Sequence, residues 1–249
     1  MSEVVPYPDE GELFNAAEKK SDHLIFFAHF FKGHKKALRR HVELVNSLGY
    51  DAYVFNLRDD FGEHYFVPYS EISEKFGMKH ALADQIEEHL NELPEYKTKI
   101  IFAFSNVAGS AIEAMGRRDS QDIVALICDS GPGRSFVDSS FKLAKQQFKI
   151  KFLPLTMLAT PMVILGWSKD MNKDVALDLQ KLPEGFPILS IRGWKDKLIT
   201  PSSIDKIFEP CKNLNWVKLA LPEAGHVSGL KEFPDEYKAG IVNFLNSLD

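Results

Sequence analysis

From about residue 23 onward, short apolar runs alternate with longer amphipathic segments. The apolar runs predict strands at 23–30, 51–57, 99–105, 122–128, 187–193 and 215–221. Several of these runs are almost continuously apolar, which is typical of strands that are covered on both faces. The alternation therefore predicts an α/β fold with a mostly parallel central sheet flanked by helices.

Three segments between and after these runs show helical periodicity. Residues 35–49 place Leu38, Val42 and Val45 on one face and end at Gly49, a residue suited to a helix C-terminus. Residues 81–93 and 236–248 repeat apolar positions at the same spacing, and we expect them to pack on the sheet.

The alternation breaks between residues 131 and 184, where an amphipathic stretch is followed by the apolar run 152–167. We interpret 131–184 as a helical cap inserted into a single domain that spans 1–249. The apolar run is shorter than the ~20 residues that a membrane-spanning helix needs, and two prolines interrupt it. A buried or pocket-covering segment is the favoured interpretation, with membrane contact as the alternative.

Composition narrows the function further. The formal charge of −5 provides no positive field for nucleic acid, so we expect no nucleic-acid partner. The two cysteines have no paired spacing, and residues 1–22 lack the pattern of a secretory signal, so a cytoplasmic location is expected. Because metal-binding and nucleotide-binding motifs are lacking, we predict no metal and no cofactor. The oligomeric state is not predicted.

Two strand ends carry side chains suited to acid–base chemistry. The segment 187–208 reads as a strand, a turn at Gly193, Asp196, and a helix that starts near Thr200 and Pro201. The last strand is followed by a turn of small residues that presents His226. In the α/β-hydrolase fold the acid and then the histidine follow the nucleophile in the chain, which makes Asp196 and His226 candidates for these roles.

The nucleophile has two candidate positions in the turn after the strand 99–105. If it is Ser105, Val107 stands where the motif G-x-S-x-G has its second glycine. If Ala108 and Gly109 are the small pair, the apex falls on Asn106, whose neutral amide cannot serve as the nucleophile.

Two further residues are candidates for supporting roles. An oxyanion hole needs a second backbone N–H from the loop after the first core strand, and Phe31 is the candidate, with Phe30 in the place of an expected glycine. His29 beside them is interpreted as structural. Asp129 also ends a strand and is an alternative acid, although a turn-forming role is favoured for it.

Three motifs resemble those of the transmembrane-protein-53-like proteins, an α/β-hydrolase-like family of ill-defined function. They are Phe-Ser-Asn at 104–106 with Gly109 and Ser110 after it, 128–133 (CDSGPG) and 225–237 (GHVSGLKEFPDEY). The resemblance implies that Ser105 is the elbow serine with Asp196 and His226 as its partners. Val107 departs from the family pattern, so a bulged elbow or a displaced serine are both open.

These residues lead to two functions from different classes. The first is a serine hydrolase of the carboxylesterase or lipase type that acts on a small, lipophilic acyl ester through Ser105, Asp196 and His226. The alternative is a noncatalytic binding or scaffold protein that keeps the fold with a degenerate elbow. A hydrogen bond between Ser105 and His226 would favour the enzyme, whereas Asn106 at the apex would favour the scaffold.

Overall fold

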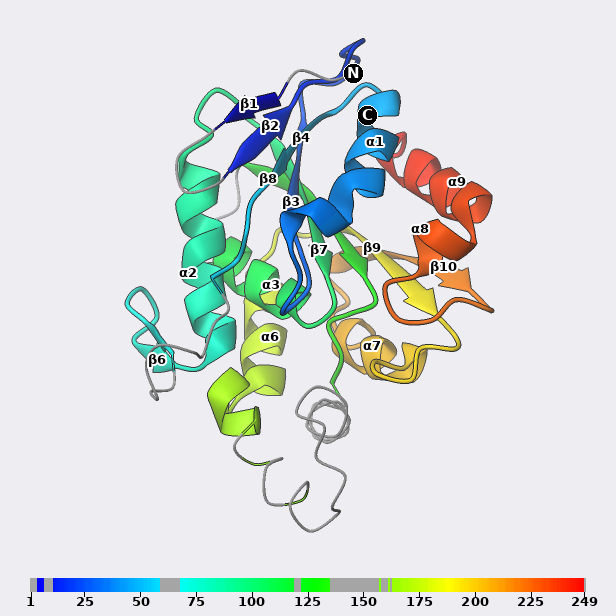
Figure 1. Cartoon of the computed structure of the whole chain (residues 1–249). Coiled ribbons are helices and arrows are strands. Elements are labelled where there is room, and N and C mark those ends of the chain that lie inside the picture. Colours follow the sequence, from blue (N-terminus) through cyan, green and yellow to red (C-terminus); the bar gives the residue numbers. More distant parts are fainter. Residues whose placement is uncertain are drawn as a thin grey trace.

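The computed structural model describes residues 4–6, 11–58, 68–118, 122–134, 157, 161 and 163–248. Its centre is an eight-stranded sheet in the order β1-β2-β4-β3-β7-β8-β9-β10 (Figure 1). The strands of this sheet are β1 (Val4–Pro6), β2 (Glu12–Phe14), β3 (Leu24–Ala28), β4 (Asp51–Val54), β7 (Lys99–Phe104), β8 (Ile123–Asp129), β9 (Phe186–Gly193) and β10 (Leu214–Leu221). A separate antiparallel pair is formed by β5 (Tyr69–Ser70) and β6 (Lys75–Phe76).

The six strands from β4 to β10 in this order are parallel, and only the edge beyond β4 departs from that direction. β2 pairs antiparallel with both β4 and β1. The six parallel strands are the six that the hydrophobic pattern predicts, whereas β1 and β2 were not predicted. A three-residue strand is too short to give a periodic signal, and β2 consists only of Glu12, Leu13 and Phe14.

Helices cover both faces of the sheet. The first face is covered by α1 and α9, with the 3-10 turn before α1 and the short α8, and the opposite face by the other four (Figure 1). The helical elements are η2 (Lys35–Leu38), α1 (Arg39–Ser47), α2 (Met78–Asn91), α3 (Val107–Arg117), α6 (Met171–Gln180), α7 (Pro201–Phe208), α8 (Gly229–Glu232) and α9 (Pro234–Leu245). The predicted helices 35–49, 81–93 and 236–248 are therefore present, the first as a 3-10 turn that continues into α1.

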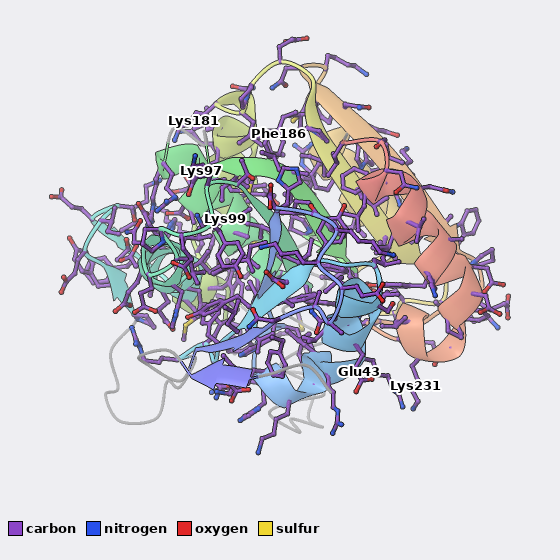
Figure 2. All side chains as sticks on the ribbon, turned by 90° about the horizontal axis from the view of Figure 1, so that it is seen from above. Glu43, Lys97, Lys99, Lys181, Phe186 and Lys231 are labelled. Carbon is purple, nitrogen blue, oxygen red and sulfur yellow. The ribbon has the colours of Figure 1, made fainter. Side chains whose placement is uncertain are left out.

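Burial on both faces explains the continuous apolar runs. Every residue of β3 and β7 is buried, and their side chains alternate between two separate clusters of buried residues, one on each face. In the view from above, Lys99 and Phe186 lie where β7 and β9 begin (Figure 2). Because the six parallel strands point the same way, the loops that follow them gather at the opposite edge.

A buried ionic cluster joins three helices on the face of α2. Lys79 of α2 has no exposed surface and bonds Glu113 of α3, with Asp178 of α6 at 3.9 Å. His80 also hydrogen-bonds Glu113 and reaches the hydroxyl of Ser168 at 3.2 Å. Burial alone would raise the pKa of Glu113, but the hydrogen bond from His80 and the charge of Lys79 hold it well below its usual value.

The predicted cap lies largely outside the described residues. Residues 135–156 are among those not described, so the interpretation of 131–184 as a cap stays a prediction. The carboxyl-terminal part of that range is α6, which packs on α3 with Met171 and Val175 against Gly109. Of the apolar run 152–167, residues 157, 161 and 163–167 are described and are helical. Among the described residues, no helix has the length and apolar character needed to cross a membrane.

Candidate active site

Ser105 occupies a sharp turn between β7 and α3. Its φ of 54° lies in the left-handed region, which is uncommon for residues other than glycine, and the next residue is already the N-cap of α3. The backbone N–H of Ser105 donates to the carbonyl of Asp129 at 2.8 Å, which ties the turn to the end of the neighbouring strand β8. A side chain on such a turn stands above the carboxyl end of the sheet.

Ser105, His226 and Asp196 are joined by two hydrogen bonds. Ser105 Oγ lies 3.0 Å from His226 Nε2, and His226 Nδ1 lies 2.7 Å from Asp196 Oδ2. Asp196 is buried, and its other oxygen, Oδ1, accepts the N–H groups of Leu198 and Ile199 at 2.8 and 2.9 Å. Since an ionised Asp196 only accepts, Nδ1 of a neutral His226 carries the proton and Nε2 accepts from the serine hydroxyl.

Asn106 does not occupy the apex of the turn. Its φ of −70° and ψ of −13° are helical, and its side-chain oxygen accepts the N–H of Gly133 at 3.3 Å. Val107, the residue that departs from G-x-S-x-G, begins α3 and is fully buried in the core. The sequence left the register open between Ser105 and Asn106, and the backbone angles put Ser105 at the turn.

The close backbone approach that G-x-S-x-G assigns to its second glycine is made by Gly131 instead. A Cβ on Gly131 would lie 2.2 Å from the carbonyl oxygen of Ser105. At Gly109, by contrast, a Cβ would meet side chains of α6 at 3.4 Å, an ordinary contact distance. The turn after β8, rather than the first turn of α3, therefore packs backbone to backbone against Ser105.

Asp129 and its neighbour Ser130 lie between the serine turn and the histidine loop. Asp129 does not bond His226; its two carboxylate oxygens accept the hydroxyls of Tyr237 at 2.7 Å and Ser130 at 2.8 Å. Burial raises the pKa of Asp129 above its ordinary value, although these two hydrogen bonds act in the opposite direction. Ser130 Oγ also accepts the N–H of Val227, the residue after His226, at 2.9 Å.

The loop after β3 lies beside the serine turn, because β3 pairs with β7 and Ala28 stands opposite Ala103. His29 is buried; its Nε2 accepts the N–H of Leu57 at 2.9 Å, so its Nδ1–H donates to the carbonyl of Phe30 at 2.8 Å. Gly33 N–H donates to the same carbonyl. In a trans peptide the N–H points away from the C=O, so these bonds fix the direction of the Phe31 N–H.

Several of these contacts were missed by the sequence reasoning. Ser130, Val227 and the hydroxyl of Tyr237 were not predicted, because Tyr237 reads only as an apolar position of a packing helix. The short sequence Asp129 to Gly133 contained a usable signal, since two glycines around a proline fix a turn at a strand end. That signal predicts a turn but does not tell which loops the turn touches.

Comparison with solved structures identifies the fold as that of the α/β hydrolases. An esterase from Pyrococcus furiosus matches with a TM-score of 0.66 at 18% identity, covering 100% of this chain and 90% of that one. A thermostable carboxyl esterase from Bacillus coagulans in complex with glycerol matches with a TM-score of 0.69 at 12% identity, covering 100% and 98%. MenH from S. aureus matches with a TM-score of 0.59 at 16% identity, covering 96% and 98%.

Sequence comparison adds no closer relationship. No protein-family model matches the chain, and no curated protein sequence matches it. The structural matches share less than a fifth of their residues with this chain, so they define its fold. The function has to be inferred from the geometry around Ser105.

Proposed function

We propose that this protein is a serine hydrolase that cleaves a small acyl ester, with Ser105 as nucleophile, His226 as base and Asp196 as the acid that orients it. The observation that carries the proposal is the continuous hydrogen-bonded chain from Ser105 Oγ through His226 to Asp196, with distances of 3.0 and 2.7 Å. Both lengths are those of a nucleophile–base pair whose base is held by a third group.

The reaction follows from which atoms hold protons. Ser105 Oγ attacks the carbonyl carbon of the ester as its proton passes to His226 Nε2, and the carbonyl oxygen takes the negative charge. The tetrahedral intermediate then expels the alcohol, which takes that proton from His226 and leaves an acyl group on Ser105. Water repeats the sequence, releasing the acid and restoring the serine. Asp196 stays ionised and stabilises the imidazolium that forms twice in each cycle.

Two backbone N–H groups are suited to hold the oxyanion. One belongs to Asn106, the residue after the proposed nucleophile, and the other to Phe31 in the loop after β3. The hydrogen bonds from His29 and Gly33 to the Phe30 carbonyl support the second assignment, since they hold the peptide that carries the Phe31 N–H. Asn106 thus contributes its backbone, while its side chain fixes the turn at Gly133.

The substrate we propose is a lipophilic acyl ester. The ring of Phe31 meets Trp167 edge to face at 5.2 Å, so an aromatic pair adjoins the proposed oxyanion loop. The matching structures from Pyrococcus furiosus and Bacillus coagulans are both esterases, which supports the same class of reaction. The motif resemblance to the transmembrane-protein-53-like proteins supports the assignment of Ser105, Asp196 and His226 to the triad. Cys128 and Cys211, both free, support the proposed cytoplasmic location.

The test uses a fluorophosphonate probe and p-nitrophenyl esters of short and medium chain length. We expect the wild type to be labelled and to turn over the esters, and Ser105→Ala and His226→Ala to lose both. Ser110→Ala is the matched control, since Ser110 is a buried serine of α3 five residues further on. Folded wild type that is neither labelled nor active on any ester would reject the proposal and favour the noncatalytic scaffold.

A further inference from the structure

Three residues with left-handed backbones meet around the proposed active site. Ser105, Ser130 and Val227 have φ values of 54°, 59° and 52°. A β-branched residue such as Val227 is strained there, and such strain persists only where surrounding contacts hold the residue in place. For Val227 the holding contact is its N–H, which donates to Ser130 Oγ at 2.9 Å.

The contacts of Ser130 continue into a buried chain that ends on α9. The hydroxyl of Ser130 donates to Asp129 Oδ1, and Tyr237 donates to Asp129 Oδ2. Asp129 and Ser130 are each 2% exposed, and Tyr237 is fully buried. The chain therefore runs from the helix Tyr237 belongs to, through a strand end, to the peptide bond directly after His226.

The same strand end also holds the serine. The carbonyl of Asp129 accepts the N–H of Ser105, and Gly131 packs against the Ser105 backbone. Ser130 N–H donates to the carbonyl of Ile191 in β9, the strand that leads to Asp196. Residues 129–131 thus contact the elements that carry all three members of the proposed triad.

We propose that Tyr237, Asp129 and Ser130 are positioning residues that fix the His226 loop relative to Ser105, and that the Asp129 carboxylate is a second negative charge acting on His226. This inference rests on the proposed function, because it concerns how the same site is held. Burial would favour the neutral form of Asp129, whereas two donated hydroxyl hydrogens favour its carboxylate. The hydroxyl of Tyr237 links this strand end to α9.

The ionisable groups around Asp129 are those whose pKa values would change if Asp129 lost its charge. Asp196 and His226 interact with it electrostatically, and Tyr237 bonds it directly. On the far side of Tyr237, the ring of His41 lies 5.7 Å away. Replacing Asp129 with asparagine keeps the shape and removes the charge, so it separates the electrostatic effect of the carboxylate from its packing.

The experiment compares Tyr237→Phe, Ser130→Ala and Asp129→Asn with two controls that remove the same atoms elsewhere. Tyr53→Phe removes a buried hydroxyl that bonds His89, and Ser110→Ala removes a buried hydroxyl that has no partner among the described residues. Ester hydrolysis is measured as kcat and KM across pH 4–9. Titration of the His226 ring is followed by NMR, with the signal assigned by its loss in His226→Ala.

We expect Tyr237→Phe and Ser130→Ala to lower kcat roughly 10- to 100-fold with KM nearly unchanged, the effect of losing a hydrogen bond to a charged group. Asp129→Asn should move the acid limb of the rate profile, and the His226 titration, to lower pH by about half a unit or more. The two controls should match the wild type.

The inference is overturned if the Tyr237, Ser130 and Asp129 variants all have the same kcat and the same His226 titration as the two controls. The NMR titration needs no turnover, so it separates two failures. If the wild type neither hydrolyses esters nor reacts with the probe, the proposed function fails, and an unshifted His226 titration in Asp129→Asn then rejects the positioning role as well. A shifted His226 titration in a protein without esterase activity would support the effect of Asp129 on His226 and reject only the proposed hydrolase function.

Discussion

Ser105 and Gly131 are in contact backbone to backbone, so closely that a Cβ on Gly131 would lie 2.2 Å from the Ser105 carbonyl oxygen and 2.9 Å from its Cα. No side-chain rotation can relieve a contact between two main chains. The left-handed turn at Ser105 therefore depends on a residue without a side chain at the end of the adjacent strand.

Gly131→Ala is expected to displace the serine turn. The added methyl group forces one of the two main chains to move. We therefore expect the unfolding free energy to fall by at least about 1–3 kcal/mol and probe labelling to be lost. Gly109→Ala is the matched control, because its Cβ would meet Met171 and Val175 at 3.4 Å. Urea denaturation and fluorophosphonate labelling measure both effects. Equal behaviour of the two variants would contradict the assignment of the close contact to Gly131.

Asp196→Asn should nearly abolish activity while leaving the fold intact. The amide oxygen can still accept the N–H groups of Leu198 and Ile199, which places the NH₂ group toward His226 Nδ1. His226 would then carry its proton on Nε2 and could not accept one from Ser105. We expect kcat to fall roughly 1,000- to 10,000-fold with little change in melting temperature.

Asp205→Asn provides the comparison for that experiment. Asp205 lies on α7 and bonds Arg192 and Lys218, neither of which belongs to the proposed triad. Its variant should keep the ester hydrolysis rate within about twofold of the wild type. Activity of Asp196→Asn close to that of Asp205→Asn would show that Asp196 does not orient the base.

The sequence predicts the parts of the molecule that depend on local pattern. Long apolar runs predict all six parallel strands, and the strand-turn-helix pattern around Asp196 places that residue at a strand end, where the structure has it. The choice between Ser105 and Asn106 could not be made this way. It depends on Gly131 in the turn after β8, 26 residues further along the chain, and no periodicity around Ser105 carries that information.

Breaking the buried ion pair under α2 should be far more costly than breaking an exposed one in the same cluster. Lys79→Met removes a fully buried cation from the Glu113 carboxylate, which keeps Arg117 and His80, and we expect a loss of about 3 kcal/mol. Lys75→Met removes a half-exposed lysine from Asp174, which should cost about 0–1 kcal/mol. Thermal and urea unfolding of both variants measure the contrast, and similar losses would contradict it.

His41 should make the protein less stable as the pH falls. Its ring is enclosed by Phe27, Phe102, Phe104 and Tyr237, and neither ring nitrogen has a hydrogen-bond partner among the described residues. Burial, aided by the charge of Arg40, lowers the pKa of His41 from 6.5 to about 3. The folded protein therefore keeps this ring neutral over a range in which the unfolded chain protonates it.

The sign of the effect follows from that difference. Well above pH 6.5 the ring is neutral in both states and contributes no pH dependence. Between about pH 6 and pH 3 only the unfolded chain takes up the proton, so the His41 contribution to the unfolding free energy falls by up to ~1.4 kcal/mol per pH unit.

His41→Leu removes this pH-dependent contribution and also two buried nitrogens without partners among the described residues. We therefore expect the variant to be more stable than the wild type, increasingly so at lower pH. Urea denaturation at pH 7.5, 6 and 5 tests this against His34→Leu, which alters an exposed histidine. A stability difference between His41→Leu and the wild type that stays constant across the three pH values would show that His41 takes up its proton equally in both states, contrary to its burial among four aromatic rings.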